Sequence, residues 1–117
     1  MNPKHTKRIY ISGPMEGKRQ HNKGAFKSAE KQLERMGHSP VNPFDLQVDP
    51  IHMITANPTR QDFYRKDVRA LTYCDGILML KGWNMSHGAQ FERYVAIEMG
   101  LTVHYEDEIE NGELRRR

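Results

Sequence analysis

The stretch from Asp67 to Glu92, DVRALTYCDGILMLKGWNMSHGAQFE, decides the predicted fold. Its first residues continue a helix, the apolar run 76–80 predicts a strand covered on both faces, and Ser86 opens a second helix. In such a helix–strand–helix unit, Asp67 and Glu92 can both reach the carboxyl end of the strand, where open α/β sheets bind ligands. The hypothesis is that Glu92 is a nucleophile and Asp67 its partner.

The segments before this unit predict another strand and two helices. Residues 8–12 alternate β-branched and aromatic side chains and stop at Gly13 and Pro14, which is typical of a strand that ends in a sharp turn. Apolar residues at helical spacing predict a helix over 22–36 and another from Arg60. Strands and helices therefore alternate along the chain, as they do in α/β folds.

The remaining segments have weaker patterns. Residues 39–43 predict an edge strand, because proline cannot donate a hydrogen bond to a central ladder. Residues 44–59 predict a long loop, in which one helical turn over 50–54 is an option. Residues 101–105 predict the last strand, and the charged tail 106–117 is expected at the periphery.

Together these elements predict one α/β domain with a core at about residues 8–105. A chain of 117 residues is long enough for a single core but not for two. The sheet is expected to be parallel and doubly wound, flavodoxin- or Rossmann-like, with about four or five strands and right-handed crossovers.

Composition and charge describe an ordinary soluble protein. The net charge is +3, and basic residues gather at 4–8, 18–23 and 115–117 without the interleaved aromatic side chains of a nucleic-acid surface. Nucleic acid is therefore an unfavoured partner. No apolar run approaches the roughly 20 residues of a membrane helix, and no apolar signal region follows the basic N-terminus. We expect a cytoplasmic protein that does not contact a membrane.

Several classes of site are not indicated by the sequence. The single cysteine, Cys74, cannot form an internal disulfide, and no Cys/His spacing resembles a zinc site. The loop after the first strand lacks the G-x-G-x-x-G and G-x-x-x-x-G-K-S patterns of dinucleotide and nucleoside-triphosphate sites. We expect neither a metal nor an organic cofactor.

Glu92 is the most informative single position. On its helix it shares one stripe with Val95, Ala96 and Met99, which is the stripe expected to face the core. A carboxylate on that stripe is costly unless it is paired or used in chemistry. The alternatives are a structural ion pair or a helix rotated so that Glu92 meets solvent.

Two loops are expected to meet beside these carboxylates. Ser86 is a good helix N-cap, the free amides after it attract an anion such as phosphate, and Gly88 allows close approach of a ligand. An ordinary cap followed by a tolerated glycine is an equal alternative. Ser12, Gly13 and Pro14 follow the first strand, so they are expected at the same edge of the sheet.

Two aromatic residues each have two possible roles. Tyr10 either presents its hydroxyl at this edge or is an ordinary core residue of its strand. Trp83, beside Gly82, either stacks on a base or covers the edge of the sheet.

Three motifs together resemble the nucleoside 2-deoxyribosyltransferase family. They are Y-I-S-G-P-M at 10–15, D-V-R-A-L-T-Y-C-D at 67–75 before an apolar strand, and S-x-G-x-x-x-E at 86–92. The likeness is closest to the small branch that includes 2′-deoxynucleoside 5′-phosphate N-hydrolases and cytidylate hydrolases. An uncharacterised bacterial and phage-type branch carries a signature similar to G-W-x-x-S-x-G-A-x-x-E at 82–92.

The resemblance implies an enzyme that acts on the N-glycosidic bond of a nucleoside or nucleoside 5′-monophosphate. Glu92 would attack C1′ of the sugar to give a glycosyl-enzyme, as in retaining glycosidases. Asp67 would orient the sugar or help to protonate the departing base, and Tyr10 would hold or tune Glu92. Ser86 and Gly88 would bind the 5′-phosphate where there is one.

Further implications concern the first loop and the assembly. Gly13 would make room beside the sugar, and Ser12 and Pro14 would belong to the same substrate-binding loop. The nucleotide hydrolases have serine and arginine after the first-strand glycine, whereas this chain has Pro14, Met15 and Glu16; Lys18 or Arg19 could substitute. The resemblance also implies a dimer or larger homo-oligomer.

The sequence leaves hydrolase and transferase open, because they differ only in whether water or a second base takes the glycosyl group from Glu92. The alternative from another class is a catalytically idle domain of the same fold that binds or sequesters a nucleotide. The presence of both Asp67 and Glu92 argues against it, since binding alone does not require the two together.

Overall fold

The computed structural model describes residues 6–48, 57–110 and 113–114. The strands and long helices of this part are β1 (Arg8–Ser12), α1 (Lys23–Arg35), β2 (Ser39–Val41), α2 (Arg60–Leu71), β3 (Gly76–Met79), α3 (His87–Glu98), β4 (Thr102–Tyr105), β5 (Ile109–Glu110) and β6 (Glu113–Leu114). Short 3-10 helices lie between them at η1 (Arg19–Asn22), η2 (Pro43–Asp45), η4 (Trp83–Met85) and η5 (Glu106–Glu108).

Strands β1 to β4 form one parallel sheet in the order β2-β1-β3-β4, which confirms the predicted fold class and strand number. Tyr10 on β1 is paired with Val41 of β2 and with Ile77 of β3. The chain moves outward from β1 to β2 on one side and returns to β3 on the other. The topological switch point, where open α/β sheets bind ligands, therefore lies between β1 and β3.

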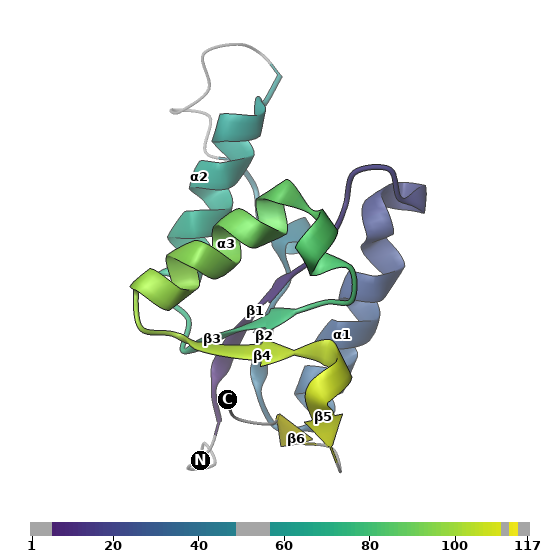
Figure 1. The fold of residues 1–117 in the computed structure, drawn as a ribbon, viewed down its shortest axis with the longest axis vertical. Coiled ribbons are helices and arrows are strands. Elements are labelled where there is room, and N and C mark those ends of the chain that lie inside the picture. The colour runs from purple at the N-terminus through teal and green to yellow at the C-terminus, as the bar shows by residue number, and fades with distance from the viewer. Residues whose placement is uncertain (1–5, 49–56, 111–112, 115–117) are drawn as a thin grey trace.

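Alternation along β1 divides the core into two layers. Ile9 and Ile11 pack with Phe26 of α1 on one face of the sheet, whereas Tyr10 packs on the other face with residues of α2 and α3. Figure 1 shows this arrangement, with α1 on one side of the sheet and α2 and α3 on the other. The face that carries Tyr10 also carries Ser12, two positions further along the strand.

The observed elements follow the predicted ones closely. The strand expected over 39–43 is the edge strand β2, but it ends at Val41 because the chain turns there into η2. Asn42 caps that turn by accepting a hydrogen bond from the backbone N–H of Phe44 at 3.0 Å. The helical turn considered for 50–54 lies outside the described residues.

The tail contains structure that its sequence does not predict. Beyond η5, β5 and β6 pair as a small antiparallel hairpin. Ile109 and Leu114 pack against the core layer that contains α1. In the part of the chain that the structure describes, no helix combines the length and apolar character required to cross a bilayer.

Candidate active site

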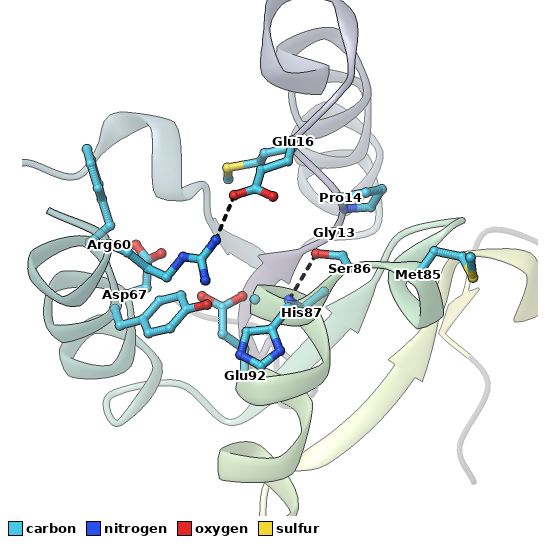
Figure 2. Close-up of a pocket in the computed structure, with 14 residues that line it drawn as sticks. Gly13, Pro14, Glu16, Arg60, Asp67, Met85, Ser86, His87 and Glu92 are labelled. Carbon is cyan, nitrogen blue, oxygen red and sulfur yellow. Dashed lines mark hydrogen bonds and ion pairs between the residues drawn. The ribbon is translucent and has the colours of Figure 1, made fainter.

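A pocket of about 270 Å³ opens at the carboxyl ends of β1 and β3, at the switch point of the sheet. Three segments line it: residues 13–16 after β1, the side chains of Arg60, Phe63, Tyr64 and Asp67 on α2, and residues 85–89 with Glu92 around the start of α3. Figure 2 shows Asp67 and Glu92 from different helices in the same pocket. The two carboxylates singled out in the sequence therefore share one site.

Glu92 is held by two hydroxyl groups from β1. The Tyr10 hydroxyl donates a 2.8 Å hydrogen bond to Oε2, and the Ser12 hydroxyl donates a 2.6 Å hydrogen bond to Oε1. Both donors lie on the face of β1 that meets α3, and only 7% of Glu92 is exposed. Glu92 faces the core and is not rotated into solvent.

Burial and a neighbouring charge govern the protonation of Glu92. Burial, and after it the negative charge of Asp67, raises the pKa of Glu92 to about 8. The hydrogen bonds from Ser12 and Tyr10 act in the opposite direction, because they stabilise the anion. The pKa of Tyr10 itself lies well above its usual value, because the phenol is buried and faces Glu92, so Tyr10 remains a donor.

Asp67 is the second half of the carboxylate pair. Burial raises its pKa, while the ammonium group of Lys66 opposes that rise. Lys66 Nζ lies 3.2 Å from Asp67 Oδ1, which is an ion-pair distance, yet Oδ1 accepts no hydrogen bond from the described residues. Because the pKa of Glu92 is raised to about 8, this pair of carboxyl groups keeps a proton near neutral pH, and neighbouring carboxyl groups lose their protons as a pair rather than independently.

The loop after β1, residues 13–16, is held in place by the residues around it. Asn22 Nδ2 donates a 2.9 Å hydrogen bond to the carbonyl of Pro14. At Gly13, an added Cβ would lie 2.8 Å from Leu80 Cβ, so the close approach of the segments that follow β1 and β3 requires glycine there. At Gly88, an added Cβ would meet Tyr64 only at 3.7 Å, an ordinary van der Waals contact.

An ion pair crosses the mouth of the pocket. Arg60 Nη2 lies 3.0 Å from Glu16 Oε1, joining the first turn of α2 to the loop after β1 (Figure 2). Both side chains are largely exposed, at 56% and 88%. An exposed pair of this kind contributes at most about 1 kcal/mol, so a ligand can separate it at little cost.

The start of α3 has the cap that its sequence predicts. Ser86 Oγ accepts a 3.2 Å hydrogen bond from the backbone N–H of Ala89. The backbone N–H of Gln90 bonds to the Ser86 carbonyl. Ser86 therefore acts as an ordinary cap, while it and Gly88 also line the pocket.

The structure brings most of the predicted site residues together. Those that line the pocket are Gly13, Pro14, Asp67, Ser86, Gly88 and Glu92. Tyr10 and Ser12 lie behind Glu92 and reach the site through it. Trp83 does not line the pocket: its ring packs 5.6 Å from that of Tyr105 on the edge strand β4, which agrees with the edge-covering alternative.

Three pocket-lining residues of α2 were not among the site residues predicted from the sequence. Arg60, Phe63 and Tyr64 precede Asp67 at helical spacing, so they share its face of α2 and line the pocket with it. That spacing could have identified them once Asp67 was placed in the site. Of the described residues, no three His, Cys, Asp or Glu side chains are grouped so that they could hold a metal ion.

Two solved structures that share this fold have little sequence identity with this chain. The structure "2-desoxiribosyltransferase from Leishmania mexicana" aligns with a TM-score of 0.60 and 18% identity, covering 94% of this chain and 79% of that one. A conserved protein from Enterococcus faecalis V583 aligns with a TM-score of 0.60 and 16% identity, covering 91% and 68%. At these identities the likeness shows the fold alone.

Curated proteins give no match to the sequence. A family model described as a domain of unknown function, DUF4406, matches residues 7–105. Because this match covers most of the chain, the protein belongs to the DUF4406 family.

Proposed function

We propose that the protein cleaves or transfers the N-glycosidic bond of a nucleoside or nucleoside 5′-monophosphate. The observation that carries this proposal is the buried Glu92 carboxyl group, held by two hydroxyl donors and placed beside Asp67 in one pocket. A carboxylate nucleophile with a second carboxyl group as acid is the arrangement of a retaining glycosidase. The fold shared with a structure titled a 2-desoxiribosyltransferase supports the same chemistry.

The first step forms a glycosyl-enzyme. A carboxylate oxygen of Glu92 attacks C1′ of the sugar, the C1′–N bond breaks, and its electron pair leaves with the base. The proton of the carboxylate pair passes through Asp67 to the departing base, which makes the base a better leaving group. The remaining negative charge stabilises the oxocarbenium-like transition state.

The second step releases the sugar from Glu92. Water, or the nitrogen of a second base, attacks C1′ and breaks the bond to the Glu92 oxygen, while Asp67 accepts the proton of the attacking group. Water gives a hydrolase and a second base gives a transferase.

The dimensions and walls of the pocket suit a small ligand. Its volume of about 270 Å³ lies just below the roughly 300–1,000 Å³ that is usual for ligand pockets. Phe63, Tyr64 and Met85 provide apolar surface in the lining of the pocket, suitable for contact with a base. Arg60 and the amides that begin α3 are the groups available to a 5′-phosphate.

An idle nucleotide-binding domain is the second candidate, and one observation favours it. A pKa of about 8 leaves Glu92 largely protonated in the empty pocket at neutral pH, and a neutral acid is a poor nucleophile. The proposed reaction therefore depends on transfer of that proton when substrate is bound.

The test is a chromatographic screen of nucleosides and nucleoside 5′-monophosphates, with and without a second free base. We expect release of free base that is lost in Glu92→Gln and retained in Glu98→Gln, which changes an exposed residue of the same helix. Base exchange that requires an added acceptor would identify a transferase. Tight binding without reaction would support the idle domain.

Asp67→Asn separates a catalytic role for Asp67 from a structural one. We expect a large loss of turnover with a much smaller loss of stability. An unfolded variant would favour a structural role.

The resemblance also implies a homo-oligomer, which light scattering of the purified protein can test.

A further inference from the structure

Lys66 is a nearly buried cation beside the carboxylate pair, with only 10% of its side chain exposed. Its ammonium group lies 3.2 Å from Asp67 Oδ1 and donates a 3.0 Å hydrogen bond to the carbonyl of Pro43. It also lies 5.2 Å from the centroid of the Phe63 ring. Lysine is rarely buried to this extent unless it is paired. These contacts therefore indicate that the surrounding protein fixes the position of the charged Lys66 ammonium group.

The position of this ammonium group is set by two separate parts of the chain. Lys66 belongs to α2, and neighbouring residues on a helix point about 100° apart and do not normally face each other. The Pro43 carbonyl, in the 3-10 turn after β2, holds the Lys66 side chain close to Asp67. The ion pair therefore depends on tertiary structure and not on helix geometry alone.

A count of charges shows what Lys66 contributes to the pocket. The groups that act most strongly on the Asp67 carboxyl are Lys66 from its own helix, Glu92 from α3 and Tyr10 from β1. Tyr10 is neutral, so a charged Lys66, a charged Asp67 and a protonated Glu92 form a cluster without net charge. Without the cation, the same cluster would carry a buried negative charge, which is costly.

We propose that Lys66 is a positioning residue, which holds the Asp67 carboxylate in its charged form beside Glu92 and so sets where the pair keeps its single proton. Its role in turnover rests on the function proposed above. The proton begins on Glu92, passes to the charged Asp67 as Glu92 attacks C1′, and ends on the departing base. Lys66 does not touch the substrate in this scheme.

The test compares Lys66→Met, which removes the charge, with Lys66→Arg, which keeps it. Lys27→Met is the matched control, because Lys27 forms an ion pair of similar length, 3.1 Å, with Glu30 on α1. The readout is the pH titration of the Asp67 and Glu92 carboxyl carbons by NMR, which requires no turnover.

We expect Asp67 in Lys66→Met to titrate at a pH higher by about one unit or more, since a cation at this distance lowers an aspartate pKa by about 1–3 units. In both Lys66→Arg and Lys27→Met, Asp67 should titrate at a pH close to that in the wild type. The acid limb of the pH–rate profile should shift by the same amount. An unchanged Asp67 titration in folded Lys66→Met would overturn the proposal.

A second measurement keeps the proposal testable if Lys66→Met does not fold. In the wild-type protein, the NMR signal of the Lys66 ε-carbon should respond as Glu92 titrates, and no response would overturn the proposal.

The two proposals can also fail separately. A shifted titration with no turnover of any nucleoside or nucleotide would reject the proposed function alone, whereas turnover with an unshifted titration would reject the role of Lys66 alone.

Discussion

The hydroxyl of Tyr10 donates a 2.8 Å hydrogen bond to Glu92 Oε2, joining the middle of β1 to the core-facing side of α3. Tyr10 is fully buried, so water does not compete for this contact. The bond stabilises the Glu92 anion and lowers its pKa, against the larger effect of burial. The central strand of the sheet thus provides both a core side chain and a tuning group for the site.

Tyr10→Phe should retain the packed ring and lose this hydrogen bond. The pKa of Glu92 should then rise further, which leaves less of the anion for attack. A hydrogen bond to a charged group contributes about 1.5–3 kcal/mol, so kcat/KM should fall roughly 10- to 100-fold. Steady-state kinetics measure this, with Tyr73→Phe as an exposed control. An unchanged kcat/KM would show that Tyr10 only fills the core.

Glu92→Gln should change how stability depends on pH. The folded-state pKa of Glu92 is about 8, above its ordinary value of 4.5, so the folded state binds the proton more tightly than the unfolded state. Its contribution to stability is complete below about pH 4.5 and is lost as pH rises through 8. The slope is at most about 1.4 kcal/mol per pH unit.

Urea unfolding at pH 5.5 and pH 8.5 tests this prediction. The free energy of unfolding of Glu92→Gln should increase relative to that of the wild type between the two pH values. Glu98→Gln, an exposed change on the same helix, should follow the wild type. Parallel wild-type and Glu92→Gln curves would contradict the raised pKa.

The contacts of Tyr10 and Ser12 follow from features that the sequence does contain. Their spacing of two places both on one face of β1, and the stripe of α3 that carries Glu92 is predicted to face the core. A parallel sheet then brings those two faces together. This part of the site could be predicted because it depends on local periodicity and on general rules of topology.

Other features depend on tertiary contacts that have no local pattern. Gly82 has a positive φ of 89°, and Trp83 after it packs against Tyr105 and the Arg93 guanidinium instead of lining the pocket. The contact of Lys66 with Pro43 joins segments 23 positions apart. The two-residue strands β5 and β6 are too short to show any alternation.

Glu16→Gln should improve the use of a nucleoside 5′-monophosphate relative to the nucleoside. In the wild type, Arg60 is paired with Glu16 at 3.0 Å, so a phosphate must compete with that carboxylate and approach its negative charge. An exposed pair contributes at most about 1 kcal/mol, which corresponds to a change of about fivefold or less. The ratio of kcat/KM values for the two substrates measures it.

Two further variants complete that comparison. Arg60→Gln should lower the ratio, and Glu34→Gln, an exposed change on α1 away from the pocket, should leave it unchanged. If Glu16→Gln and Arg60→Gln both leave the ratio unchanged, the mouth of the pocket does not contact the 5′ end of the ligand.

Gly13→Ala should destabilise the protein through packing and not through the loss of a backbone conformation. Its Cβ would lie 2.8 Å from Leu80 Cβ, in the segment directly after β3, which is closer than Cβ atoms normally approach. Overpacking of this kind costs about 1–3 kcal/mol. Gly24→Ala on α1 is the control, because an added Cβ there meets nothing within 4 Å and alanine favours a helix. Urea unfolding should therefore show a loss of stability for Gly13→Ala and none for Gly24→Ala; equal stability of the two variants would show that the sheet yields at Leu80.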